Sequence, residues 1–100
     1  MTQTEFLTRM ADLYATNLEI SRKKNSDYAS ETDPFLNFRA CETYGISCEK
    51  AIVVRMSDKL VRVANLLDKQ AQVVDESLMD SLSDLTNYAM ILRIYIEQKK

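Results

Sequence analysis

The chain has 100 residues, which is enough for one domain with a modest hydrophobic core. Hydrophobic residues make up 46% of it, so its composition is not that of a disordered protein, and a single Gly and a single Pro favour long helices over a turn-rich β fold. A net charge of −2 without a basic stripe argues against binding to DNA or RNA, and short apolar runs interrupted by charges exclude a membrane span.

The cysteine and histidine content narrows the possible chemistry. Cys41 and Cys48 are too few for a zinc site of the usual Cys/His type, and we expect reduced thiols. Because the chain has no His, Ser-His and Cys-His nucleophilic schemes are excluded, and any catalysis must use carboxylates, Lys, Tyr or a metal. Glu5 and Asp12 lie where a signal peptide would need an apolar core, so we expect a cytoplasmic protein.

The first half of the chain predicts one long helix and one short helix. Residues 3–24 carry apolar side chains at helical spacing and finish in a basic turn, which suits a helix C-terminus. Residues 25–33 begin with Asn-Ser-Asp and are predicted as a loop. Asp33 as N-cap, with the proline after it, starts a short helix over residues 34–43. Gly45, the only glycine, suits the position of positive φ that ends this helix.

The second half predicts a hairpin of two long helices. Ser47 is the N-cap candidate of a helix that runs to about Lys69, and after a connection over residues 70–74, Asp75 is the cap of a last helix over about 76–98. The two apolar stripes are Ile52, Met56, Leu60, Val63 and Leu67 on the first helix and Leu78, Leu82, Leu85, Ala89, Leu92 and Ile96 on the second. We therefore predict a single all-α domain, a small bundle of three long helices and one short helix whose last two helices form an antiparallel hairpin.

The last predicted helix carries a row of acids one turn apart. Glu76, Asp80 and Asp84, continued by Asn87, share one narrow face because each residue turns the helix by about 100°. Like charges at this spacing cost a helix about 0.2–0.5 kcal/mol per pair, and the helix dipole compensates only the first of them. We expect a cation to face this row, either a basic side chain, a metal ion or both.

The preceding helix carries a strip that is mostly basic. Its members are Arg55, Asp58, Lys59, Arg62 and Asn65. Apolar residues flank this strip on both edges, which is unusual for a face exposed to solvent. One interpretation is structural, with Asp58 and Arg62 paired along the helix and the other bases neutralising the acid row across the hairpin. The functional interpretation is a site where carboxylates hold Mg²⁺ or Mn²⁺ and the basic groups bind phosphate oxygens.

The segment after the first helix allows the same two interpretations. Lys24, Asp27 and Tyr28 place a cation, a carboxylate and an aromatic ring close together, where they could meet a phosphate and a base. Alternatively, Lys24 compensates the helix dipole, Asp27 forms a turn and Tyr28 anchors the loop. Asn37 orients a ligand in one interpretation and is an ordinary surface residue of the short helix in the other.

Four motifs in this order resemble a known family. They are K-x-x-D-Y from Lys24, D-P-F-x-N-F from Asp33, R-x-x-D-K-x-x-R from Arg55, and E-x-x-x-D-x-x-x-D-L-x-N-Y-A from Glu76. Together they resemble the nucleotide modification associated domain, type one, of phage and bacterial proteins, over about residues 20–90. That group is similar to the MazG-like all-α nucleoside triphosphate pyrophosphatases.

The resemblance implies a function and site roles. The expected protein is an all-α homo-oligomer, a dimer or tetramer, in the cytoplasm (the host cytoplasm if phage-encoded), with Mg²⁺-dependent cleavage of a (deoxy)nucleoside triphosphate to the monophosphate and pyrophosphate. The metal ligands would be Glu76, Asp80 and Asp84, and the catalytic carboxylates Asp58, Glu76 and Asp80. The residues that contact the nucleotide would be Lys24, Asp27, Tyr28, Asn37, Arg55, Lys59, Arg62 and Asn87.

Two other functions stay open at this point. MazG-like enzymes carry a pair of acids followed by a third on the earlier helix, where this chain offers only Asp58. That departure favours a non-catalytic protein that binds or sequesters a nucleotide. The third hypothesis is a helical interaction protein in which the basic strip and the acid row are mutual salt bridges.

Overall fold

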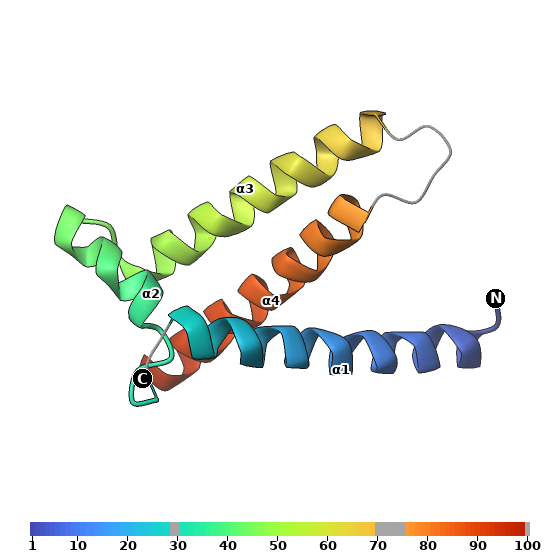
Figure 1. The fold of residues 1–100 in the computed structure, drawn as a ribbon, viewed down its shortest axis with the longest axis horizontal. Helices are drawn as coiled ribbons and strands as arrows, with labels where there is room; N and C mark the ends of the chain where they lie inside the picture. The colour runs from blue at the N-terminus through green and yellow to red at the C-terminus, as the bar shows by residue number, and fades with distance from the viewer. Residues whose placement is uncertain (29–30, 70–75, 100) are drawn as a thin grey trace.

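Every regular element in the described part of the chain is helical. The computed structural model describes residues 1–28, 31–69 and 76–99, with Tyr28 and Glu76 described by their backbone alone (Figure 1). The elements are α1 (Gln3–Tyr28), α2 (Leu36–Arg39), the 3₁₀ helix η1 (Ala40–Tyr44), α3 (Cys48–Lys69) and α4 (Glu76–Lys99). The predicted all-α fold is confirmed. None of these helices is long and apolar enough to cross a bilayer.

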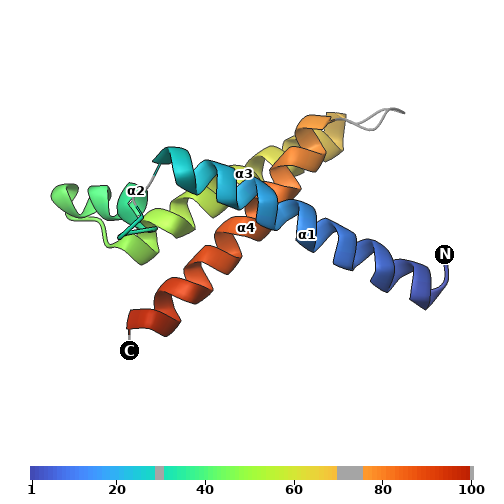
Figure 2. The ribbon, with the colours of Figure 1, turned by 60° about the horizontal axis from the view of Figure 1, so that its bottom comes forward.

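The helices α3 and α4 lie side by side and confirm the predicted hairpin (Figure 1). Ser47 begins α3 as predicted, because its Oγ accepts from the Lys50 amide at 3.2 Å and its carbonyl accepts from the Ala51 amide at 2.9 Å. The predicted connection over residues 70–74 and the predicted cap at Asp75 lie outside the described residues. The helix α1 crosses α4, and its N-terminal half projects beyond the hairpin (Figures 1 and 2).

The prediction that α1 ends at residue 24 was wrong, since the helix continues to Tyr28. Asn, Ser and Asp interrupt a helix when their side chains bond to the neighbouring backbone. Here the Asn25 side chain is used elsewhere, because its Nδ2 donates to the Pro34 carbonyl at 2.9 Å. The Asn25 amide therefore joins α1 to the segment that follows it.

The predicted helix over residues 34–43 is present as two shorter pieces, α2 and η1. Asp33 caps the turn before α2, with its Oδ1 accepting from the Phe35 amide at 3.0 Å, while its Oδ2 accepts from Arg39 Nε at 2.9 Å. Gly45 has the predicted left-handed conformation, with φ of 77°, and its amide donates to the Glu42 carbonyl at 3.0 Å. These two ends hold the segment as one compact corner before α3.

The hydrophobic core lies where this corner meets the start of α3 and the end of α4. Its buried members are Phe35, Phe38, Cys48, Ala51, Ile52 and Tyr95. The rings of Phe35 and Tyr95 meet edge to face at a centroid distance of 5.1 Å. Both cysteines are free thiols as predicted, and Cys48 is packed in this core.

The predicted apolar stripes are only partly covered within one chain. Ile52 and Val63 of α3 and Leu78 of α4 are buried. In contrast, Leu60 and Leu67 remain 58% exposed, although they belong to the same α3 stripe. The main buried cluster of a single chain therefore occupies one end of the hairpin, and much apolar surface stays exposed along the rest.

Candidate functional site

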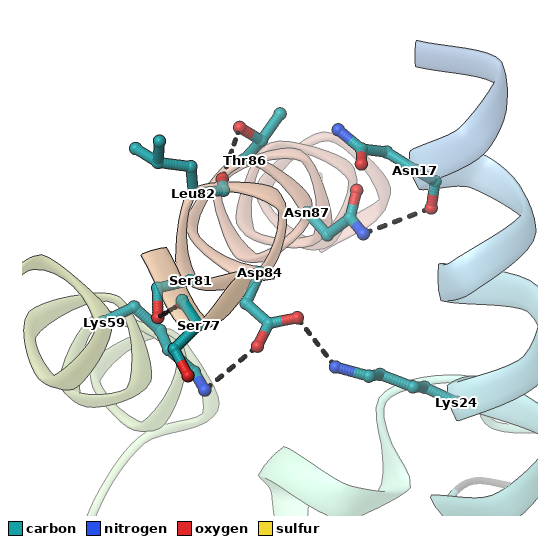
Figure 3. A network of polar contacts seen from close by, with 9 residues as sticks. All are labelled: Asn17, Lys24, Lys59, Ser77, Ser81, Leu82, Asp84, Thr86 and Asn87. Atoms are coloured by element: carbon teal, nitrogen blue, oxygen red, sulfur yellow. Dashed lines mark hydrogen bonds and ion pairs between the residues drawn. The ribbon is translucent and has the colours of Figure 1, made fainter. Parts of the chain in front are cut away.

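The Asp84 carboxylate of α4 forms ion pairs with side chains of the other two long helices. Its Oδ1 accepts from Lys24 Nζ of α1 at 2.7 Å, and its Oδ2 accepts from Lys59 Nζ of α3 at 3.0 Å (Figure 3). The Asp84 side chain is 14% exposed, so this contact is shielded from water on most sides. The last acid of the predicted row thus has basic side chains facing it, one from each neighbouring long helix.

The two lysines keep the Asp84 carboxyl ionised. Burial raises the pKa of Asp84, but the hydrogen bonds and positive charges of Lys24 and Lys59 outweigh burial and hold the pKa below its usual value. Lys24 is therefore not simply the dipole compensation considered for the end of α1, since its ammonium group reaches across to α4. Asp84 therefore holds the ammonium groups of Lys24 and Lys59 close to each other.

One turn further along α4, Asn87 ties this helix to α1. Its Nδ2 donates to the main-chain carbonyl of Asn17 at 3.1 Å (Figure 3). Asn17 is 8% exposed and lies where α1 crosses α4. Two successive polar residues on one face of α4, Asp84 and Asn87, therefore hold α1 in place through Lys24 and Asn17.

A cavity of about 420 Å³ opens beside Asp84, bounded by α1, α3, α4 and the segment that carries α2. Six of its lining residues were predicted from the sequence: Lys24, Asn37, Arg55, Lys59, Asp84 and Asn87. Six were not assigned to a site: Ser21, Asn25, Pro34, Phe38, Tyr88 and Ile91. Three of these, Pro34, Phe38 and Tyr88, belong to the motifs that carry the family resemblance, so the motifs could have been used to predict them as site residues.

The lining of this cavity is cationic and aromatic. Lys24, Arg55 and Lys59 oppose a single carboxylate, that of Asp84, so the charged groups sum to a positive site. The Phe38 ring lies against the Tyr88 ring, edge to face at a centroid distance of 6.0 Å. A cavity with fixed cations and aromatic walls suits a ligand that has an anionic part and a flat apolar part.

The remaining predicted residues do not line this cavity in the described structure. Four of them have side chains that are exposed to solvent outside the cavity: Asp27, Asp58, Arg62 and Asp80. The side chains of Tyr28 and Glu76 lie outside the described residues, so their predicted roles stay predictions. Among the side chains that the structure describes, no three acidic, Cys or His residues gather as a metal site. The predicted metal set of Glu76, Asp80 and Asp84 therefore also stays a prediction.

Comparison with known proteins adds one finding. Residues 41–96 match the model of a family described as Nucleotide modification associated domain 1. The match includes α3 and all of α4 but its last three residues, and with them Arg55, Lys59, Asp84 and Asn87 of the cavity. No curated protein and no solved structure matches the chain.

Proposed function

The chain belongs to the Nucleotide modification associated domain 1 family, and from that premise we propose that the cavity beside Asp84 binds a nucleoside or deoxynucleoside triphosphate. The observation that carries the proposal is the convergence of Lys24, Arg55 and Lys59 on one cavity that also has aromatic walls. Its volume of about 420 Å³ is within the usual range for small-molecule sites.

The three cations would bind the phosphate groups. Arg55 offers the planar fork that matches two phosphate oxygens, and each lysine offers a compact charge. Because Asp84 already holds Lys24 and Lys59 in place, these two lysines lose less side-chain entropy when a ligand binds. Asp84 would then be a positioning residue for the phosphate site.

The aromatic and amide side chains would receive the nucleoside. The rings of Phe38 and Tyr88 offer apolar contact to a base, and the amides of Asn37 and Asn87 offer hydrogen bonds to base or sugar edges. Asn25 lines the same cavity, and its amide nitrogen is bonded to the Pro34 carbonyl. The nucleoside would therefore lie toward α2 and the phosphates toward α3.

The finer proposal is hydrolysis that depends on Mg²⁺ or Mn²⁺. Asp84 is held by two lysines, so the acids left for the metal are Asp80 and Glu76, one and two turns earlier on α4. Two acids would be enough for this ion, because Mg²⁺ often takes one or two carboxylates and completes its shell with water and substrate phosphates. When bound, the ion would neutralise phosphate charge and make a bound water more acidic.

The proposed reaction is attack of water on the triphosphate, which breaks the bond between the α- and β-phosphates and releases a nucleoside monophosphate and pyrophosphate. Arg55 and Lys59 would stabilise the negative charge that develops on the pyrophosphate as it leaves. Asp58 is exposed, one turn from Arg62 on α3, and its catalytic role rests on the family resemblance alone.

A test combines binding and turnover with the same purified protein. We expect a panel of nucleoside and deoxynucleoside triphosphates to include at least one that raises the melting temperature in Mg²⁺ and releases pyrophosphate. Lys59→Ala should raise the Kd for the nucleotide at least tenfold and lower the rate of pyrophosphate release at least tenfold. Lys50→Ala is the matched control, because Lys50 is an exposed lysine of α3 that does not line the cavity.

A non-catalytic nucleotide-binding protein is the second candidate. The engagement of Asp84 by two lysines favours it, since that carboxylate is then occupied in holding cations. Nucleotide binding that Lys59→Ala weakens, without pyrophosphate release from any triphosphate, would support this candidate over the hydrolase.

The Lys24–Asp84–Lys59 contacts also favour the third candidate, a helical interaction protein with structural ion pairs. In that case no nucleotide would raise the melting temperature, with or without Mg²⁺. This result would refute nucleotide binding itself, because a ligand that binds the folded state must stabilise it.

A further inference from the structure

The helix α1 has an apolar face that continues beyond the part covered by α4. Phe6, Met10, Leu13 and Asn17 follow one another at spacings of four, three and four, so they lie along one face. At Asn17 this face meets α4, but every residue from Met1 to Thr16 is exposed. The N-terminal half of α1 accordingly projects away from the hairpin (Figures 1 and 2). A helical half of this length without tertiary contacts is marginal in water.

A hollow of about 260 Å³ lies along this face and ends at Thr86 of α4. At its inner end, the buried Oδ1 of Asn17 has no hydrogen-bond partner within the described part of the chain. Figure 3 shows that Asn87 bonds to the main-chain carbonyl of Asn17 and so does not satisfy this oxygen. Buried polar atoms in native structures are almost always paired, so this oxygen is an exception. The lining of the hollow is mainly apolar, which suits an apolar occupant.

The surface of the whole chain is larger than a monomer of its size requires. The chain exposes 7660 Å², whereas a compact monomer of 11.5 kDa exposes about 5,800 Å². The excess of about 1,900 Å² per chain is what each partner of an obligate homodimer commonly buries. The radius of gyration of 15.5 Å likewise exceeds the value of about 13 Å for a compact domain of 100 residues.

Charges along one edge of the face select the occupant. Arg9 lies between Glu5 and Asp12, which are one turn before and almost one turn after it on the same side of α1. If a second α1 is placed antiparallel, equivalent edges face each other, and each Arg9 approaches an acid of the other helix. In a parallel arrangement, the edge with Arg9 would face the opposite, uncharged edge of the other helix.

We propose that the N-terminal half of α1 docks against the same half of a second copy of this chain, antiparallel and related by a two-fold axis. Phe6, Met10 and Leu13 form the buried centre of this contact, and Arg9 forms ion pairs at its edge. Such an interface is self-complementary, as a two-fold dimer requires. This proposal goes beyond nucleotide binding and does not depend on it.

The first test is the mass of the full chain in solution by light scattering after size exclusion. We expect the wild-type chain to be a dimer or a higher even assembly, and Leu13→Glu to halve that mass or reduce it to a monomer. Leu18→Glu is the matched control, because it makes the same change on the same helix. Leu18 is 71% exposed and lies about 100° around the helix from Asn17, away from the centre of the apolar face. Leu18→Glu should keep the wild-type mass.

Two outcomes would overturn the proposal. One is a wild-type chain that stays monomeric up to its solubility limit, which would assign the face to a different protein. The other is a Leu13→Glu variant that keeps helical circular dichroism and the wild-type mass.

A cross-linking test covers the case in which Leu13→Glu fails to fold. Met10→Cys should form a disulfide-linked dimer under mild oxidation, since Met10 lies near the expected two-fold axis. Leu18→Cys shares the same background of Cys41 and Cys48 and should not. Equal cross-linking of the two variants would count against the antiparallel contact.

Discussion

At the level of single residues, the Asp84 side chain connects three helices. It is partly buried, ionised, and shared by lysines from two other helices. A carboxylate in that position joins α1, α3 and α4 and at the same time orders two cations at the edge of a cavity. The same contact therefore contributes to stability and prepares the proposed phosphate site.

Replacing Asp84 tests its structural contribution. Asp84→Asn keeps the size of the side chain but removes the charge that both lysines share, and we expect it to lower the free energy of unfolding by about 1–3 kcal/mol. Urea denaturation monitored by circular dichroism measures the change. Asp68→Asn, at an exposed acid of α3, should change stability by less than about 0.5 kcal/mol. Equal losses in the two variants would show that the Asp84 contact is not special.

The same carboxyl predicts a dependence on pH. Since the pKa of Asp84 is lowered in the folded chain, its ion pairs stabilise fully above the ordinary Asp value of about 3.9. This stabilisation declines as the pH falls from that value through the lowered folded pKa. We expect the wild-type advantage over Asp84→Asn, measured by urea denaturation from neutral to acidic pH, to shrink only below about pH 4. An advantage that disappears near neutral pH would contradict this assignment.

At the scale of elements, the corner between α1 and α3 positions one wall of the cavity. Pro34, Asn37 and Phe38 line the cavity from this segment. The corner is held by Asp33 at its start and by the left-handed Gly45 at its end. Its geometry is therefore set by a few local hydrogen bonds and by one backbone conformation.

Gly45 gives a direct test of that geometry. A Cβ at Gly45 would meet no atom within 4 Å, so the cost of Gly45→Ala should be conformational alone, at about 1–2 kcal/mol for a positive φ. Gly45→Asn should cost less, because Asn tolerates this region better than Ala does. Thermal denaturation of both variants measures the difference. If Gly45→Asn were as destabilising as Gly45→Ala, the left-handed conformation would not be the cause.

At the scale of the whole molecule, a small core is combined with a long, open arrangement of helices. The buried cluster occupies one end of the α3–α4 hairpin, while the N-terminal half of α1 extends away from it. Leu60 and Leu67 of α3 and Leu82 of α4 are also exposed in one chain. The apolar stripes of three helices thus continue past the surface that a single chain can cover.

This arrangement predicts that stability depends on protein concentration. If a second copy covers α1, dissociation accompanies unfolding, and the melting temperature should rise as the protein concentration is raised. Calorimetry over a hundredfold range of concentration measures this effect. Leu13→Glu should remove the dependence, and Leu18→Glu should preserve it. A melting temperature that stays constant across the range would indicate that unfolding does not involve dissociation.

Local signals in the sequence are enough to predict the helical class, the hairpin and the bounds of α3 and α4. These features depend on local signals that act within a turn or two: the Ser47 cap, the left-handed Gly45, and apolar side chains at helical spacing. The sequence also indicated half of the cavity lining. Projection onto a helix face found Arg55, Lys59, Asp84 and Asn87, whereas Lys24 and Asn37 came from the motifs around the short helix.

Tertiary packing sets where α1 ends and pairs Asp84 with two lysines. The extension to Tyr28 goes with a bond from Asn25 to Pro34, nine residues away, and Lys24 reaches Asp84 across sixty residues. Helical periodicity tells which residues share a face but not which face of another helix lies opposite. That choice depends on how three helices pack. The sequence therefore showed the acid row and a basic strip that could face it, but not that Lys24 and Lys59 both pair with Asp84.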